Sequence, residues 1–201
     1  MSFDTAMPMN LPDDPNRRFW IAAVSVTGGT GLAATAVPFV ASMSPSERAR
    51  AEGSPTQANL QALSPGEMMT VEWRKQPIFV LRRSKAMLET LTAHDELLAD
   101  PQSRRSLQPG YANNVTRSVR PELSVLIGVC THLGCIPTFR PTPGAADLGG
   151  SWPGGFYCPC HGSKFDLAGR VFKNVPAPTN LVVPAYHFTS DSDLLIGVDP
   201  A

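Results

Sequence analysis

A long run without charged residues near the N-terminus is the first pattern in the chain. Residues 19–43 hold no Asp, Glu, Lys or Arg over 25 positions. As an α-helix, that length spans about 37 Å, against a hydrocarbon core of about 30 Å. We therefore predict one transmembrane helix over 19–43, after an N-terminal segment 1–18. A cleaved signal peptide is the alternative, because Ala34-Thr-Ala36 is similar to a cleavage site.

The next segment, residues 44–65, has a different composition. It is rich in Ser, Ala, Pro, Gln and charged residues and shows no apolar periodicity. Such a composition favours an extended or flexible connection over a packed element. We predict a flexible neck that joins the membrane helix to a head over residues 66–201.

Short apolar runs separated by turn residues fill the head. Residues 69–73 and 77–81 flank a polar turn and predict a hairpin, and Ser84 can cap a short helix that ends before Pro101. Further strands are expected at 123–129, 170–172, 181–183, 186–189 and 194–198. Many short strands with turns between them predict an antiparallel β sandwich or barrel. The fold class is thus mainly β, with one N-terminal transmembrane helix.

Several polar or irregular features of the head have structural rather than chemical readings. His94 is expected at the surface near the end of the short helix, and His187 is expected to be structural within a strand. Residues 103–106 predict a solvated loop. The Pro- and Gly-rich stretch 137–155 reads as an insertion that faces a partner.

The charged residues give little information about binding partners, but a pair of arginines is informative about export. The chain has 17 basic and 17 acidic residues, so its net charge of zero suggests no nucleic-acid partner. Arginines flank the apolar run on both sides, which leaves loop charge uninformative about orientation. The start Arg17-Arg18-Phe19 resembles a twin-arginine export signal, without the usual residue before Phe. It predicts a cytoplasmic N-terminus and a periplasmic head.

All four cysteines and two of the four histidines lie in two short boxes, Cys130-Thr-His132-Leu-Gly-Cys135 and Cys158-Pro-Cys160-His161-Gly-Ser163. Each box offers one Cys and one His to a common metal centre and has one further Cys. A closed zinc site would use four of these six residues, although Cys-x-His is tight for a zinc finger. Two plain disulfides would leave both histidines unexplained.

The boxes resemble those of the Rieske family, whose [2Fe-2S] centre takes two thiolates on one iron and two imidazoles on the other. The resemblance covers the whole plan of anchor, neck and head. Within the family, the chain most resembles the iron–sulfur subunits of bacterial cytochrome bc complexes. It implies one cluster per chain, ligated by Cys130, His132, Cys158 and His161. It also implies a disulfide between Cys135 and Cys160, which suits an oxidising compartment.

The resemblance extends to residues that tune the cluster. Ser163 matches a serine whose hydroxyl bonds a bridging sulfide. Phe165 stands where respiratory relatives commonly have a tyrosine that bonds a cysteine sulfur. Because a phenyl ring has no donor, we expect a lower potential than in relatives with tyrosine, with Tyr157 as the other candidate donor.

Two further segments are expected at the cluster tip. Residues 175–181, including Pro176, resemble the proline-rich third loop that covers the cluster, with Val175 in place of the usual glycine. Leu133, between ligand His132 and Gly134, is expected to contact the quinol-oxidising partner.

The function implied by the resemblance is electron transfer in a quinol–cytochrome c reductase of the respiratory chain. A cluster with two neutral imidazoles is formally neutral when oxidised, so its potential should be high and it should accept an electron from quinol. The resemblance places the transferred proton on a ligand histidine, preferably His161, and the next acceptor in a membrane-bound c-type cytochrome. It further implies cytochrome b as a partner, a dimeric complex and the bacterial inner membrane.

Three other functions share parts of this pattern. The Rieske small subunit of an exported oxidase, such as arsenite oxidase, would carry the export signal and disulfide but no retained anchor. A Rieske ferredoxin for an oxygenase would be cytosolic and have no use for the disulfide. A zinc-stabilised binding module would be colourless.

Overall fold

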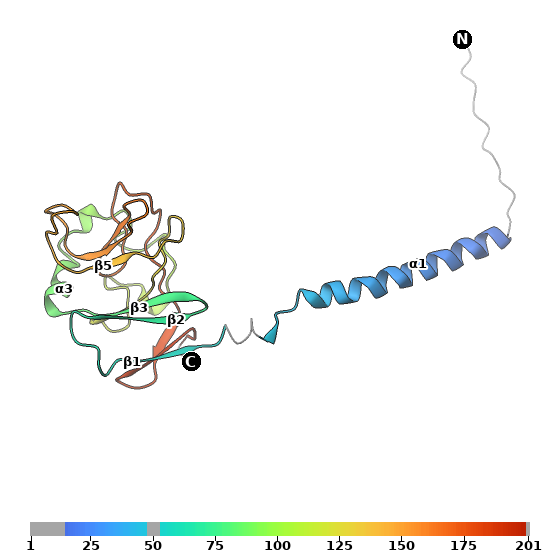
Figure 1. Cartoon of the computed structure of the whole chain (residues 1–201), viewed down its shortest axis with the longest axis horizontal. Helices are drawn as coiled ribbons and strands as arrows, with labels where there is room; N and C mark the ends of the chain where they lie inside the picture. Colours follow the sequence, from blue (N-terminus) through green and yellow to red (C-terminus); the bar gives the residue numbers. More distant parts are fainter. Residues whose placement is uncertain (1–14, 48–52, 200–201) are drawn as a thin grey trace, which may run out of the picture. The chain divides into compact units, whose positions relative to one another are not determined.

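The structure is a computed structural model that describes residues 15–47 and 53–199 (Figure 1). Contacts divide the chain into two compact units, one N-terminal and one that runs from residue 49 onward. The described part of the first unit is a long helix, and the second unit holds every described strand.

Helix α1 (Pro15–Ser42) has 28 residues and contains Pro38. Its apolar window has a mean hydropathy of 1.4, and within 15–47 and 53–199 it is the one helix long and apolar enough to cross a membrane. The hydroxyls of Thr27 and Thr30 donate to carbonyls four residues earlier, at 2.8 Å in both cases. These polar groups are therefore satisfied inside the helix, as a lipid environment requires.

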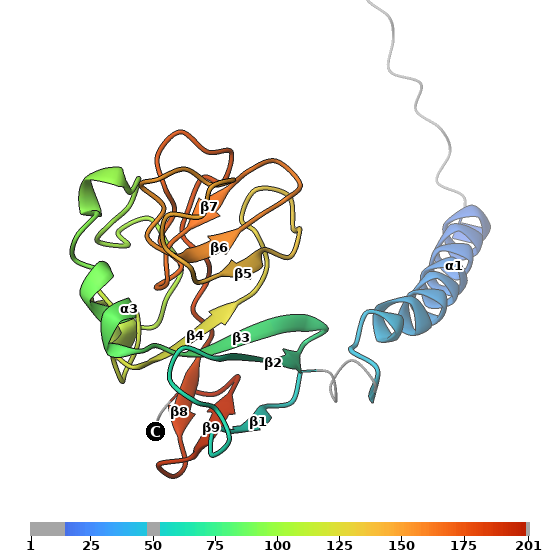
Figure 2. The same ribbon diagram turned by 60° about the vertical axis from the view of Figure 1, so that its left-hand side comes forward.

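Within its described residues the head contains three antiparallel sheets of three strands each, as predicted for a mainly β fold. The strand orders are β2-β3-β4, β5-β6-β7 and β1-β9-β8. Figure 2 shows the β2-β3-β4 sheet between the other two. The strand bounds are β1 (Thr56–Asn59), β2 (Met68–Trp73), β3 (Gln76–Arg82), β4 (Leu123–Ile127), β5 (Thr138–Arg140), β6 (Gly155–Tyr157), β7 (Lys164–Phe165), β8 (Tyr186–Phe188) and β9 (Asp193–Ile196).

One buried apolar cluster joins residues of all three sheets, and the middle sheet packs there against the β5-β6-β7 sheet. Strand β3 buries four successive residues, 78–81, and strand β4 buries its first four. Phe79 of β3 stacks on Phe156 of β6 with ring centroids 5.5 Å apart. Because such aromatic pairs bury a large apolar area, this contact fixes one sheet against the other.

The β2–β3 hairpin forms where the sequence predicted it, with a turn of two residues. Arg74 and Lys75 have φ angles of 52° and 58°, as a type I′ turn requires at both central positions. Neither is glycine, so the turn carries some backbone strain. The Arg74 guanidinium lies 4.4 Å from the centroid of the Trp73 ring, a cation–π contact that offsets part of that cost.

Strand β1 lies inside the segment predicted as a neck. Its residues 56–59 pair with β9, from Thr56 opposite Ile196 to Asn59 opposite Asp193. The head therefore begins well before residue 66. Two predicted strands are also absent from the described structure as regular elements: 170–172 is reduced to bridges from Val171 and Phe172, and 181–183 forms no strand.

The helical segments of the head are short. Ser84 caps α3 (Lys85–Thr90) as predicted, since its side chain accepts from the Met87 amide at 3.3 Å. The helix ends at Thr90, and two 3₁₀ turns follow, η1 (Asp95–Leu97) and η2 (Gly110–Ala112).

A buried charged cluster occupies the interior beside these turns, and it corrects one prediction. His94, expected at the surface, is 5% exposed, and its Nε2 lies 3.3 Å from Asp166 Oδ2. Asp166 is fully buried and accepts from Arg170 Nε at 2.7 Å. Three arginines are also fully buried, Arg83, Arg117 and Arg170. Residues 103–106 are not simply a solvated loop either, because Ser103 is buried.

Asp166 should make the head sensitive to acid. Burial raises its pKa, but the His94 hydrogen bond and Arg170 outweigh burial and hold the pKa below 3.8. A depressed folded-state pKa gives stability that is present above the unfolded pKa of about 3.9 and lost as pH falls below it. Asp166→Asn should cost about 3–5 kcal/mol at neutral pH, because it removes the buried carboxylate of Arg170 and leaves that buried cation paired with the exposed Asp95.

Thermal unfolding of the purified protein between pH 7 and pH 3 measures both effects. The variant should unfold at lower temperature at pH 7, and its midpoint should fall less on acidification than that of the wild type. Asp191→Asn is the matched control, because Asp191 pairs with Arg120 at the surface and should change little. Equal acid sensitivity in wild type and Asp166→Asn would contradict the assignment.

Candidate metal centre

The two cysteine boxes are delivered by strands of neighbouring sheets. Cys130 follows the end of β4 by three residues, and Cys158 comes directly after β6. Strand β7 begins directly after Ser163 and pairs with β6, so that Phe156 lies opposite Phe165. The second box is therefore the loop of a hairpin.

The two loops are built alike. The Cys130 amide donates to the Cys135 carbonyl at 2.7 Å, and the Cys158 amide donates to the Ser163 carbonyl at 2.8 Å. In each loop the glycine four residues after the first cysteine donates back to that cysteine's carbonyl at 3.0 Å. Both glycines, Gly134 and Gly162, have positive φ angles of 83° and 77°, which residues with a Cβ rarely adopt.

The side chains of the boxes separate into a buried base and an exposed rim. Cys130 and Cys158 are free thiols, each 2% exposed. His132 is half-buried and His161 is exposed, and their rings meet at right angles with centroids 4.8 Å apart. The structure thus places the two thiols next to each other in the interior and the two imidazoles next to each other nearer the surface.

The two remaining cysteines join the loops. Cys135 and Cys160 form a disulfide across 25 residues, with Cα atoms 6.7 Å apart, the pairing that the resemblance implied. The Cys158 sulfur lies within 4.8 Å of both disulfide sulfurs. Because a disulfide has no thiolate to offer, this three-sulfur group is not a metal site by itself. Its geometry places the crosslink against the centre.

The proline-rich segment 175–181 is attached to both boxes. The Thr131 hydroxyl donates to the Thr179 carbonyl at 2.7 Å, and the Ala177 amide donates to Ser163 Oγ at 3.1 Å. Ser163 is fully buried, and since its hydroxyl accepts here, its own hydrogen is still available for donation. Thr131 was not singled out from the sequence, because only the fold shows that it faces this segment.

Val175 does not need the conformation that the usual glycine would supply. The positive φ angle of this loop falls on Asn174, at 57°, and Asn is among the residues that tolerate it best. Val175 is half-buried and packs against the core, whereas Pro176 is exposed.

The other predicted residues divide between core and tip. Phe165 is fully buried in the same apolar cluster as Cys130 and Cys158, and Tyr157 is half-buried in β6. Leu133 is 72% exposed beside exposed Gly134, and Ile136 is 58% exposed. An apolar tip therefore surrounds the rim imidazoles.

The donor set and its surroundings fit a cationic iron–sulfur group. Burial raises the pKa of the Cys158 thiol, and the neighbouring Cys130 raises it further against a lowering by the Cys160 amide. A thiolate at Cys158 would therefore need a cation to compensate its charge. Backbone amides of the second loop and the disulfide close the base, while the imidazoles keep access to solvent. Paired thiols and paired imidazoles on facing loops define an iron–sulfur electron-transfer protein.

Comparison with known proteins agrees with this class. The family description "Rieske [2Fe-2S] domain" matches residues 56–187. The chain is 55% identical over 91% of its length to the ubiquinol-cytochrome c reductase iron-sulfur subunit of Allochromatium vinosum, covering 88% of that protein. It is 37% identical over 92% of its length to the subunit of the same name from Blastochloris viridis, covering 94%.

A mitochondrial relative is also similar. The Rieske subunit of the cytochrome b-c1 complex of Solanum tuberosum is 40% identical over 92% of this chain, which spans 64% of that longer protein. The chain belongs to the Rieske [2Fe-2S] family, among the iron–sulfur subunits of ubiquinol–cytochrome c reductases. The [2Fe-2S] cluster is therefore its cofactor, and the zinc site and oxygenase ferredoxin are no longer needed to explain the boxes.

Removal of the disulfide should weaken retention of the cluster more than folding. A crosslink across 25 residues contributes roughly 3–4 kcal/mol by chain entropy, less where a second bridge closes nearly the same loop. We expect Cys135→Ser/Cys160→Ser to assemble the centre but to lose its visible absorption several-fold faster with a chelator. A loss rate equal to that of the wild type would show that the disulfide does not protect the centre.

Proposed function

We propose that Cys130 and Cys158 ligate one iron of the cluster and that His132 and His161 ligate the other. The observation that carries this assignment is the perpendicular contact of the two imidazoles at 4.8 Å, above two buried free thiols. Cys135 and Cys160 are excluded as ligands because they bond to each other.

The protein is an electron-transfer subunit of quinol–cytochrome c oxidoreductase, in a complex with cytochrome b and a c-type cytochrome. When bound, the cluster supplies a high-potential acceptor for one electron, because two neutral imidazoles replace two thiolates. The chain holds that acceptor with its thiolate side buried and its imidazole side at the surface. An electron donor can therefore approach only from the imidazole rim.

His161 is the residue we assign to quinol, since it is the more exposed of the two imidazoles. A ring bound to iron through one nitrogen presents the other nitrogen to solvent, where it can hydrogen-bond a quinol hydroxyl and accept its proton. Imidazole is the ligand type suited to this work, because iron bound at one ring nitrogen would acidify the N–H at the other, which could then release a proton and take one up again. His132, half-buried, serves as the second imidazole ligand.

The apolar tip is the surface that we assign to docking on the quinol-oxidising subunit. Leu133 and Ile136 are large apolar side chains left mostly exposed, and such groups around a functional centre favour a partner interface. Desolvation of this tip on docking would also shield the hydrogen bond between His161 and quinol from water.

We further propose a cytoplasmic N-terminus and a periplasmic head for a subunit of the bacterial inner membrane. The Cys135–Cys160 disulfide supports an oxidising compartment for the head. Arg17 and Arg18 lie in the first turn of α1, the position expected of a twin-arginine signal; residues 1–14 lie outside the described structure. Relatives that are subunits of a membrane complex favour retention of α1 over cleavage.

The neck is proposed to allow the head to move between quinol and the c-type cytochrome. Strand β1 narrows it to residues 44–55, and 48–52 lie outside the described residues. Electron transfer over long gaps is slow, so a head that carries the electron from one partner to the other is favoured.

The relationship to the Rieske family is also the basis on which we propose that the complex is dimeric.

The exported-oxidase small subunit is the weaker candidate. Both bacterial relatives with near-complete coverage are reductase subunits, and α1 is long enough to serve as an anchor.

Electron paramagnetic resonance of reduced membranes tests the proposed function. We expect a spectrum of the imidazole-ligated [2Fe-2S] type in wild-type membranes, and a change in its line shape when an inhibitor occupies the quinol site. His161→Ser and Cys158→Ser should each abolish the signal, while Leu133→Ala should keep the signal and weaken the inhibitor response. A normal spectrum in either ligand variant would overturn the assignment.

Phe165→Tyr should raise the midpoint potential. Phe165 packs in the cluster that contains both ligand cysteines, and a phenol there supplies a donor that stabilises the additional negative charge. A hydrogen bond strengthened by about 1 kcal/mol on reduction raises a one-electron potential by roughly 40 mV. Redox titration of the visible spectrum measures the shift; Phe139→Tyr, at a half-buried position of β5 that packs against the same core, serves as a control for added polarity alone. If the potential did not rise, another donor would already bond the cysteine sulfur that the tyrosine hydroxyl was expected to reach.

A further inference from the structure

Asn180, the residue before the last position of the proline-rich segment, is fully buried, and its side-chain amide, side-chain oxygen and backbone amide are all hydrogen-bonded. Its side-chain amide donates to the Asp100 carbonyl at 3.0 Å and to Ser103 Oγ at 2.8 Å. Its side-chain oxygen accepts from the Val171 amide at 2.8 Å, and its own amide donates to Ser106 Oγ at 3.1 Å.

The partners of Asn180 lie outside the cysteine boxes. Asp100, Ser103 and Ser106 belong to one loop, which is itself held by the Asp100 carboxylate through the Arg104 and Arg105 amides at 2.9 and 3.1 Å. The hydrogen bonds that hold this carboxylate outweigh its desolvation and lower its pKa. The loop is therefore a firm anchor for Asn180 rather than a mobile neighbour.

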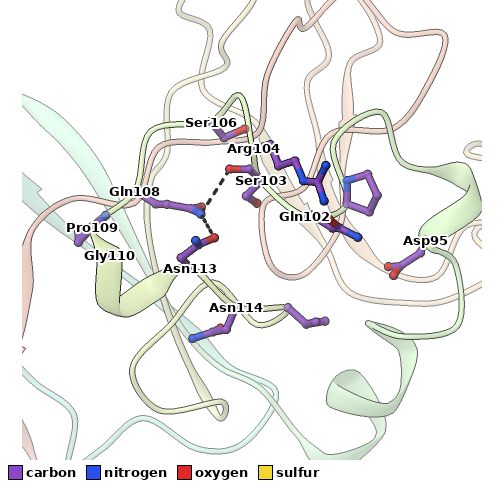
Figure 3. A pocket seen from close by; sticks show the side chains of 12 residues that line it. Asp95, Gln102, Ser103, Arg104, Ser106, Gln108, Pro109, Gly110, Asn113 and Asn114 are labelled. Atoms are coloured by element: carbon purple, nitrogen blue, oxygen red, sulfur yellow. Dashed lines mark hydrogen bonds between the residues drawn. The ribbon is translucent and has the colours of Figure 1, made fainter.

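The same loop forms a wall of a polar cavity of about 650 Å³. Figure 3 shows Ser103 and Ser106 on that wall, with Gln108 bonded to Asn113 across it. Asn180 bonds two residues of this wall, and two other residues of its segment, Thr179 and Ala177, bond to the cluster boxes. This places Asn180 between the cavity wall and the cover of the metal centre.

Backbone hydrogen bonds continue from Asn180 to the centre. The preceding residue, Thr179, accepts from Thr131 of the first box, and Ala177 donates to Ser163 Oγ of the second box. An amide that donates to a hydroxyl oxygen polarises that hydroxyl and makes it a stronger donor in turn. The position of the Ala177 amide therefore affects what Ser163 can give to a cluster sulfur.

We propose that Asn180 is a positioning residue for the metal centre. It fixes the end of segment 175–181 so that the Ala177 amide reaches Ser163, and through Ser163 it raises the reduction potential. The proposal rests on the ligand assignment above, since it requires a cluster beside Ser163. It does not require Asn180 to touch the cluster.

Redox titration of the full chain in its membrane complex tests the role. We expect Asn180→Ala to lower the midpoint potential and to speed hydrogen exchange at the amides of 175–181, because the segment loses its end restraint. Ser103→Ala removes one hydrogen bond from Asn180 and should give a smaller fall in potential, so it decides the question if Asn180→Ala does not assemble. Asn113→Ala is the control: it lines the same cavity without contacting Asn180 and should leave the potential unchanged.

A double variant separates positioning from general damage. Once Ser163→Ala has removed the hydroxyl, Asn180→Ala should lower the potential little further, because both act through the same donor. Full additivity, or an unchanged or raised potential in both Asn180→Ala and Ser103→Ala, would overturn the proposal. Absence of the [2Fe-2S] electron paramagnetic resonance spectrum from wild-type membranes would instead contradict the proposed function.

Discussion

The metal centre depends on one constraint: two loops 25 residues apart must face each other closely enough to share ligands. Each loop closes on itself through the same pair of backbone hydrogen bonds, so each presents its cysteine in a fixed direction. The packing of Phe79 on Phe156 sets the distance between the two supporting sheets. The disulfide then limits the remaining movement at the tip. The shape of each loop, the packing of the sheets and the crosslink thus each restrain the position of the ligands.

The charged interior behind the second loop is the less expected part of this support. Burial lowers the pKa of Arg117 to about 10, yet the side chain stays charged at neutral pH and donates to the carbonyls of Ala168 and Gly169. Those carbonyls belong to the turn that Asp166 also holds, through the amides of Ala168 and Arg170. A buried cation and a buried anion therefore restrain one turn from both sides. Isolated, either charge would be costly; together they fix the chain that leaves the second box.

Short-range patterns were sufficient to predict the helix, the first hairpin and the cysteine boxes, because each depends on residues within a few positions of one another. The cap at Ser84 is of the same kind. Strand β1 escaped prediction because its partner β9 lies far along the chain, where Asn59 bonds Asp193 across 134 positions. The polar alternation of Thr56-Gln-Ala-Asn gives no sign of burial until that partner is known.

His94 shows the same limit for the interior of the head. Near the end of a short helix, a histidine usually faces solvent, and here only a carboxylate 72 positions later makes burial favourable. Its ring also stacks on Phe172, with centroids 5.9 Å apart, a contact that no local periodicity encodes. The sequence could therefore identify the residues that we propose as cofactor ligands, whereas the residues that support the cysteine boxes come from distant segments.

That division matches the chemistry required at each position. The exposed positions of His161 and Leu133 suit the roles proposed for them, proton exchange with quinol and contact with a partner, and both residues lie in motifs compact enough to recognise by spacing. Groups that keep the geometry constant between oxidised and reduced states must resist movement, which requires burial and full hydrogen bonding. Asn180 and Asp166 meet that requirement, and both are fully buried. A rigid, polar interior behind an apolar, accessible tip suits the proposed movement of the head between partners, because the geometry of the centre would stay constant.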